Sequence, residues 1–161
     1  MDTAKPIRIL VVDDSAFNRQ TITAMLEGVP GFQVVGRAGD GEEGLKMAFQ
    51  LQPDVITLDL EMPKMDGFTF LRILMNRRPT PVLVISSYAR KENVFKALEL
   101  GALDFVPKPD RLGPEATDVR QEILQKVSLV RSLRPSFVPG PLVRRQTSGA
   151  FSPDGRPVRL D

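Results

Sequence analysis

Val55-Ile56-Thr57-Leu58-Asp59 is a strand-length, nearly wholly apolar run that ends in a carboxylate. A second run of this kind, Ile9-Leu10-Val11-Val12, ends at Asp13-Asp14. Continuous apolar runs are typical of strands that are buried on both faces of a parallel sheet. If the two runs are neighbouring strands, three carboxylates converge at the carboxyl edge of that sheet.

Strand-like runs alternate with segments of helical period along most of the chain. The runs begin near residues 7, 32, 55, 81 and 104. The helices are expected at residues 15–27, 41–50, 68–77 and 91–100, and within 114–133. Five such alternations indicate an α/β fold with helices on both faces of the sheet. We therefore predict a doubly wound, five-stranded parallel sheet of the flavodoxin-like type, with strand order 2-1-3-4-5.

The alternating pattern stops near residue 134. Residues 135–161 are rich in proline, glycine and arginine and have few periodic apolar positions, a composition typical of linkers. We predict a single domain over residues 1–134 and a flexible linker or tail over 135–161. The net charge of +2 comes from this tail. A few scattered arginines are a weak signal for nucleic acid, so no nucleic-acid partner is expected.

Cysteine and histidine are both absent from the chain. Their absence excludes thiolate nucleophiles, Ser-His-Asp hydrolysis, histidine-ligated zinc and phosphohistidine chemistry within this sequence. The amino terminus has no apolar signal segment, and the apolar runs are too short to span a membrane. We therefore expect a cytoplasmic protein without a membrane partner.

The acidic residues at the strand ends predict a phosphoryl-handling site. In a 2-1-3-4-5 sheet, ligands bind between the first and third strands, which are the strands that end in Asp13-Asp14 and Asp59. Clustered carboxylates repel one another, and a hard cation such as Mg²⁺ with oxygen ligands offsets that repulsion. Asp59, held rigidly after a buried strand, is the candidate nucleophile, since a carboxylate oxygen can attack phosphorus to form an acyl phosphate.

Two further runs end in groups that suit a phosphoryl ligand. Val82 to Ile85 ends at Ser86-Ser87, and Asp104 to Pro107 ends at Lys108. A hydroxyl would donate a hydrogen bond to a phosphoryl oxygen, and an ammonium would pair with another. Taken alone, an acid after a strand is often a helix cap, and a serine pair is often only a loop. The four strand ends taken together favour a phosphoryl-binding site over these separate explanations.

These residues resemble the signature of two-component receiver domains. The resemblance is carried by residues 10–15, Asp59 to Pro63 with Asp66-Gly67, Ser86-Ser87 and Lys108-Pro109. It implies that Asp59 is the phosphoacceptor. The resemblance also implies the roles of the other residues: Mg²⁺ ligands Asp13, Asp14, Asp59 and the Glu61 carbonyl; the switch hydroxyl Ser86; the invariant lysine Lys108; the switch aromatic Phe105; and a cis peptide between Lys108 and Pro109.

A closer resemblance is to the regulatory half of the chemotaxis protein-glutamate methylesterase. It rests on residues 57–63, 81–87 and 97–109. In that family a linker joins the receiver to a serine-hydrolase domain that the receiver inhibits until it is phosphorylated. The chain has no G-x-S-x-G-like nucleophile turn and no histidine, so methylesterase activity is expected only if a further domain has been cut off. The sequence is either such a fragment or a free-standing relative.

The predicted mechanism is a phosphorylation switch. A chemotaxis-type histidine kinase, or a small phosphodonor, transfers a phosphoryl group to Asp59. Ser86 and Lys108 then move toward the phosphoryl group, and Phe105 turns inward. The surface made by the fourth helix, fifth strand and fifth helix would change its output partner. Glu61 and Tyr88 are predicted to flank the entrance and tune the lifetime of the phosphoryl group.

Two other protein classes fit parts of the pattern. A magnesium-dependent phosphatase with an aspartyl nucleophile also uses a Rossmann-like sheet, but Asp59-Leu60-Glu61 lacks the second aspartate that such enzymes use as acid and base. A nucleotide-binding module is suggested by Gly36, Gly39 and Gly41, but their spacing is not that of a phosphate loop, and we interpret them as a turn.

Overall fold

The computed structural model of the chain describes residues 5–87, 90–108 and 114–133. Its strands form one parallel sheet in the order β2-β1-β3-β4-β5. The strands are β1 (Ile7–Val12), β2 (Phe32–Ala38), β3 (Val55–Leu58), β4 (Val82–Ser86) and β5 (Asp104–Pro107). The predicted sheet and strand order are confirmed.

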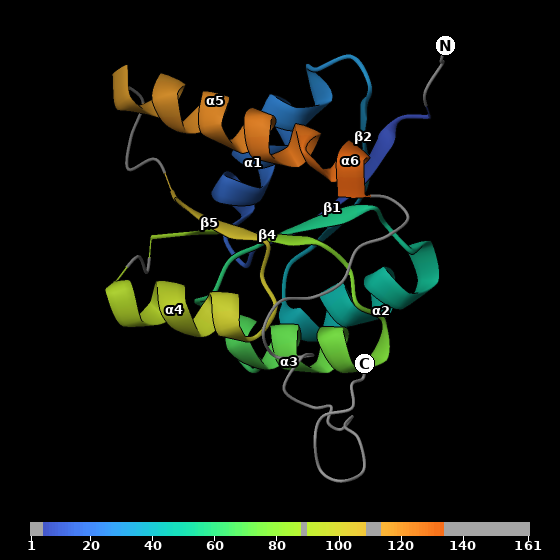
Figure 1. Cartoon of the computed structure of the whole chain (residues 1–161), viewed down its shortest axis with the longest axis vertical. Coiled ribbons are helices and arrows are strands. Elements are labelled where there is room, and N and C mark those ends of the chain that lie inside the picture. The colour runs from blue at the N-terminus through green and yellow to red at the C-terminus, as the bar shows by residue number, and fades with distance from the viewer. Residues whose placement is uncertain (1–4, 88–89, 109–113, 134–161) are drawn as a thin grey trace, which may run out of the picture.

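Helices cover both faces of the sheet. They are α1 (Ala16–Glu27), α2 (Gly41–Leu51), α3 (Gly67–Arg77), α4 (Lys91–Glu99), α5 (Pro114–Ser128) and α6 (Val130–Leu133). Figure 1 shows α1, α5 and α6 on one face of the sheet and α2, α3 and α4 on the other. This is the doubly wound arrangement that the alternating sequence pattern predicts.

Three of the helices begin at side-chain caps that the sequence supplies locally. Ser15, Asp40 and Asp66 accept hydrogen bonds from the backbone N–H groups three residues further on, at 3.2, 2.8 and 2.9 Å respectively. Such caps satisfy donors that have no partner within the helix. Because Ser15 directly follows Asp13-Asp14, and Asp66 closes the loop after Asp59, two of these caps also fix the chain next to the acidic strand ends.

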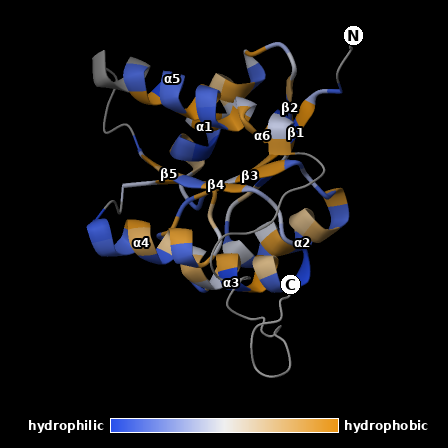
Figure 2. Cartoon of the chain, viewed as in Figure 1, coloured by the Kyte–Doolittle hydropathy of each residue, from blue (hydrophilic) through white to orange (hydrophobic). Residues whose placement is uncertain are grey.

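The sheet separates two apolar layers. Beneath α1, α5 and α6 the sheet contributes residues such as Ile9, Val11 and Ile85, and beneath α2, α3 and α4 it contributes Leu10 and Val84. Figure 2 shows mostly hydrophobic colours along the strands and a mixture of hydrophilic and hydrophobic colours along the helices on either side. Burial on both faces explains why the strand runs are continuous and do not alternate with polar residues.

The last predicted helix is divided in the structure. Helix α5 ends at Ser128 and α6 begins at Val130, and the intervening Leu129 is 56% exposed. The N–H of Leu129 is shared between the carbonyls of Gln125 and Lys126, at 3.3 and 3.2 Å. This tightened turn returns Val130 to the core, where it is fully buried. A helical segment within residues 114–133 is confirmed, but its continuity as one helix is not.

No helix in the described part of the chain is both long enough and apolar enough to cross a membrane. The predicted linker at residues 135–161 lies outside the described residues, and the domain boundary near residue 134 therefore stays a prediction.

Candidate phosphoryl-acceptor site

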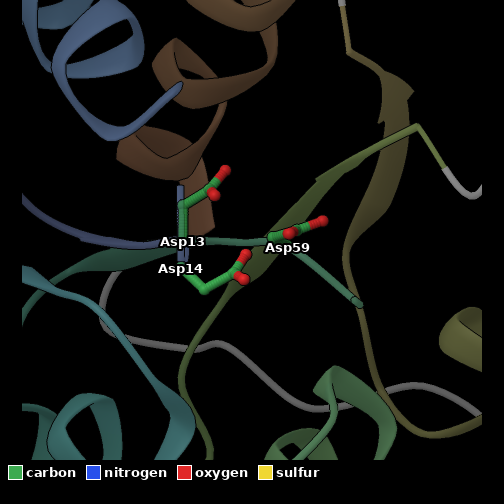
Figure 3. Close-up of side chains that lie close together, drawn as sticks. All are labelled: Asp13, Asp14 and Asp59. Atoms are coloured by element: carbon green, nitrogen blue, oxygen red, sulfur yellow. The ribbon is translucent and has the colours of Figure 1, made fainter. Parts of the chain in front are cut away.

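The carboxyl ends of β1 and β3 meet at the sheet edge. Val12 pairs with Leu58 in the parallel register, and the N–H of Asp59 donates to the carbonyl of Val12 at 3.0 Å. One carboxylate oxygen from each of Asp13, Asp14 and Asp59 lies within 4.8 Å of the others. Figure 3 shows the three side chains at these strand ends, with the carboxyl group of Asp14 turned toward Asp59. The predicted convergence of the three acids is therefore present.

Asp13 and Asp14 are adjacent in sequence but differ in burial. Asp13 is 1% exposed, and its Oδ1 accepts a hydrogen bond from the N–H of Ser15 at 2.9 Å. Asp14 lies at the surface of the site. The pair therefore offers one rigid, buried carboxylate and one that faces the solvent.

Lys108 supplies the positive charge of the site. Its Nζ lies 3.0 Å from Asp13 Oδ2 and 3.4 Å from Asp59 Oδ2. The backbone places it there, because the N–H of Lys108 donates to the carbonyl of Ser86 at 3.1 Å and so extends the pairing of β4 with β5. An ammonium between two buried carboxylates offsets their mutual repulsion.

Asp59 is the acid whose titration the site changes most clearly. Its side chain is 3% exposed, and burial raises its pKa from the ordinary value of 3.8 to about 6. The charge of Lys108 lowers the pKa, the charge of Asp13 raises it, and hydrogen bonds from the Glu61 backbone and Lys108 lower it. Desolvation outweighs the pairing, so Asp59 is a carboxylate poised close to neutral pH.

The three carboxylates fit a magnesium ion. Among the described residues, Asp59 Oδ1 has no hydrogen-bond partner although it is buried. A buried oxygen without a partner is costly, and a bound cation would satisfy it. A set of ligands made only of oxygen suits a hard cation such as Mg²⁺. Asp13, Asp14 and Asp59 are therefore the residues that would hold it.

The loop after Asp59 is folded tightly against its own strand. The N–H of Gly67 donates to the carbonyl of Leu60 at 2.9 Å, and Lys64 adopts a positive φ of 70°. A Cβ atom at Gly67 would lie 2.7 Å from Leu60 Cα and 2.9 Å from the carbonyl oxygen of Asp59. Only glycine permits this approach. The sequence pattern did not reveal that Gly67 closes this loop on the backbone of Asp59.

The other predicted site residues occupy separate positions. Ser86 is fully buried at the end of β4, and Glu61 is exposed beside Asp59. Phe105 is 8% exposed and packs in the layer beneath α2, α3 and α4, so its ring is already inside the protein in this conformation. Tyr88 and the peptide bond to Pro109 lie outside the described residues. The predicted movements of Ser86 and Phe105 stay predictions.

Sequence reasoning missed one residue that contacts the acidic pair. Arg19 lies in α1, and its Nη1 donates to the backbone carbonyl of Asp13 at 2.7 Å. An arginine on an amphipathic helix is ordinarily interpreted as a solvated charge. Only the packing of α1 against the end of β1 reveals that this one reaches back to the site.

The fold and this acidic edge agree with comparisons to known proteins. A family model for the response regulator receiver domain matches residues 9–114. The chain therefore belongs to the response regulator receiver domain family. This membership supports the receiver prediction over the phosphatase alternative.

Within that family the chain resembles chemotaxis methylesterases. It is similar to the response regulator domain of Thermotoga maritima CheB, with a TM-score of 0.75 and 38% identity, over 81% of this chain and 100% of that one. It is 56% identical over 138 residues to protein-glutamate methylesterase/protein-glutamine glutaminase 1 of Myxococcus xanthus (strain DK1622). That match covers 85% of this chain but 40% of the relative, so the chain spans about two fifths of the relative's length.

A solved structure of a different receiver carries the same fold. The CheX-CheY-BeF3-Mg²⁺ complex from Borrelia burgdorferi matches with a TM-score of 0.67 and 35% identity, over 80% of this chain and 92% of that one. The resemblance to the regulatory half of the chemotaxis methylesterase, expected from the sequence, is confirmed.

Proposed function

We propose that the chain is a phosphorylatable switch that accepts a phosphoryl group on Asp59 in a chemotaxis signalling pathway of the cytoplasm. The observation that carries the proposal is the state of the Asp59 carboxylate. It is buried, its Oδ1 has no hydrogen-bond partner among the described residues, and Lys108 Nζ lies 3.4 Å from its Oδ2. Such a carboxylate is rigidly placed and has a free oxygen for bonding.

The chemistry is an in-line displacement at phosphorus. An oxygen of Asp59 forms a bond to the phosphorus atom while the bond to the donor breaks, which leaves an acyl phosphate and the released donor. Mg²⁺ held by Asp13, Asp14, Asp59 and the Glu61 carbonyl would supply positive charge that offsets the repulsion between nucleophile and phosphoryl group. The Lys108 ammonium, which lies near the Asp59 carboxylate, would then pair with the phosphoryl oxygens, because these carry the negative charge after the transfer.

Two relatives support the parts of this proposal. The CheY complex holds BeF3 and Mg²⁺, a pair that stands in for a phosphoryl group and its metal. The Myxococcus xanthus relative is a protein-glutamate methylesterase/protein-glutamine glutaminase that is longer than this chain. We propose that the phosphodonor is a chemotaxis-type histidine kinase and that the output is a methylesterase domain or a separate partner.

The output surface would be the face formed by α4, β5 and α5. Helices α4 and α5 both contact β5, and Phe95 on α4 is 58% exposed. Lys108 follows β5 directly, so a change at the site reaches this face through a single strand.

Glu61 and Tyr88 are proposed to set the lifetime of the acyl phosphate. Dephosphorylation rates of Glu61→Ala and Tyr88→Ala equal to the parent rate would contradict that role.

The proposal is tested by incubating the protein with acetyl phosphate and Mg²⁺ and measuring its intact mass. We expect one phosphoryl group on the parent and none on Asp59→Asn. Asp66→Asn is the matched control, because it removes a nearby carboxylate but keeps an acceptor for the N–H of Thr69. Asp66→Asn should be modified like the parent. Equal modification of Asp59→Asn would refute the acceptor assignment.

A further inference from the structure

Arg19 connects α1 to the peptide that joins the two acidic residues that follow β1. Its Nη1 donates to the carbonyl oxygen of Asp13 at 2.7 Å, and its side chain is half-buried. That carbonyl belongs to the Asp13–Asp14 peptide group, which is planar. A guanidinium that fixes the carbonyl therefore also fixes the direction in which the chain leaves toward Asp14.

Asp13 itself is held by other contacts. Its N–H donates to the carbonyl of Ala38 at 3.1 Å, its Oδ1 accepts from the N–H of Ser15 at 2.9 Å, and its Oδ2 faces Lys108 Nζ at 3.0 Å. With Asp13 fixed, the rotation of the following peptide group determines where Asp14 points. The contact from Arg19 acts on that rotation.

Gly39 makes room for the guanidinium. A Cβ atom there would lie 3.2 Å from Arg19 Nη1 and 3.8 Å from its Cζ. The φ of Gly39 is not in the positive range, so its backbone does not require glycine. A side chain at Gly39 would instead press on the guanidinium of Arg19, which would have to shift. Gly39, which the sequence suggested only as a turn residue, thereby contributes to the placement of the Arg19 guanidinium.

We propose that Arg19 is a positioning residue that orients Asp14 for the metal, with Gly39 supplying the space that it needs. Arg19 contacts the carbonyl of Asp13 and does not touch the reacting atoms. This inference rests on the proposed Mg²⁺-dependent function, because it assigns a role to Arg19 in that same site. Residues that orient metal ligands typically change metal affinity by about tenfold or more when they are replaced.

The test is the Mg²⁺ dissociation constant, measured by calorimetric titration of the whole chain with MgCl2. Arg19→Met keeps the aliphatic part of the side chain but removes the donor, and we expect it to weaken Mg²⁺ binding about tenfold. Arg19→Lys keeps one donor and should recover most of the affinity. Gly39→Val, which fills the space of the guanidinium, should weaken binding as Arg19→Met does.

Arg8→Met is the matched control. Arg8 Nη1 also donates to backbone carbonyls, those of Leu51 and Gln52 at 2.9 Å each, but at the opposite end of β1. The Arg8→Met variant should have a lower urea midpoint than the parent but the same Mg²⁺ affinity. A parent protein that binds no Mg²⁺ would overturn the proposed function and this inference with it. A parent that binds Mg²⁺ no better than Arg19→Met, or an Arg8→Met variant that loses as much affinity, would overturn the inference alone.

Discussion

Lys108 Nζ lies 3.0 Å from Asp13 Oδ2, closer than it lies to the proposed phosphoacceptor. The lysine side chain is 11% exposed and that of Asp13 is 1% exposed, so this is an ion pair largely removed from water. Removing one partner of such a pair leaves an uncompensated buried charge, which costs far more than the loss of a surface pair. The lysine therefore holds the acidic cluster together before any ligand arrives.

Replacing Lys108 with methionine should strongly destabilise the metal-free protein. The variant keeps the volume of the side chain but leaves Asp13 and Asp59 without their cation. We expect a loss of roughly 3 kcal/mol in the free energy of unfolding. Urea unfolding in the presence of a chelator measures it, and added Mg²⁺ should restore part of the loss. An unchanged urea midpoint would show that the ammonium does not balance these carboxylates.

Lys126 provides a comparison in a more exposed setting. Its Nζ lies 2.9 Å from Asp104 Oδ2 and 2.8 Å from Glu122 Oε2. Burial lowers its pKa, but the hydrogen bonds and charges of Glu122 and Asp104 outweigh burial and raise it overall. Both acids are partly exposed to solvent, so Lys126→Met should cost less than about 1 kcal/mol, and salt should reduce the difference. A cost equal to that of Lys108→Met would contradict the distinction between the two sites.

The raised pKa of Asp59 predicts how stability depends on pH without metal. The folded protein holds this proton more tightly than the unfolded chain, because the pKa is about 6 when folded against 3.8 ordinarily. The free energy of unfolding should therefore fall as the pH rises from 3.8 to about 6, because over this range the unfolded chain gives up the Asp59 proton more readily than the folded protein does. Asp59→Asn should be more stable than the parent above that pH, by roughly 1–3 kcal/mol. The advantage should disappear toward pH 3.8.

Denaturant unfolding of the parent and Asp59→Asn, carried out across this pH range with chelator present, checks that prediction. Parallel stability curves for the two proteins would mean that Asp59 titrates as an ordinary carboxylate.

Magnesium binding should depend on the same proton. Mg²⁺ requires ionised ligands, so it must displace the proton that Asp59 holds with a pKa of about 6. We expect the affinity to fall steadily as pH decreases below this value. Calorimetric titrations at several pH values, in buffers of different ionisation enthalpy, should show that the number of protons released per bound Mg²⁺ increases as the pH falls toward about 6. Affinity that is constant down to the ordinary carboxylate range would contradict a role for the Asp59 proton.

Gly67→Ala tests the tight loop that follows the phosphoacceptor. The added methyl group would lie 2.7 Å from Leu60 Cα and 2.9 Å from the Asp59 carbonyl oxygen, so the backbone must shift. We expect a loss of about 1–3 kcal/mol in stability and weaker Mg²⁺ binding. Gly28→Ala is the control, because its nearest neighbour would be at an ordinary 3.7 Å. Equal urea midpoints for the two variants would show that the loop does not require glycine.

The strands and the acidic edge could be predicted from the sequence because their signals are local. A parallel strand buried on both faces is a continuous apolar run, as in residues 55–58, and the residue that follows it must emerge at the carboxyl edge. Ser15 likewise marks the start of α1, because its hydroxyl accepts the capping hydrogen bond from the N–H of Asn18. Each of these features is contained within a few consecutive residues.

The features that the sequence did not reveal depend on contacts between distant parts of the chain. Arg19 is assigned its partner by the docking of α1, and Gly67 is constrained by the backbone of Leu60. At Leu129 the backbone N–H is shared between the carbonyls of Gln125 and Lys126, a tightened turn that the helical period of the segment does not predict. Periodicity shows which face of a segment is apolar, but not where tertiary packing will interrupt it.

The most direct measurement is to trap the acyl phosphate chemically and locate it. After incubation with acetyl phosphate and Mg²⁺, borohydride reduction converts a phosphorylated aspartate to homoserine, and peptide mass spectrometry identifies the position. If Asp59 is the acceptor, homoserine should appear at residue 59, and chelating the metal beforehand should prevent its formation. Homoserine at Asp13 or Asp14, or unmodified Asp59 under conditions in which the intact protein carries a phosphoryl group, would contradict the proposed switch.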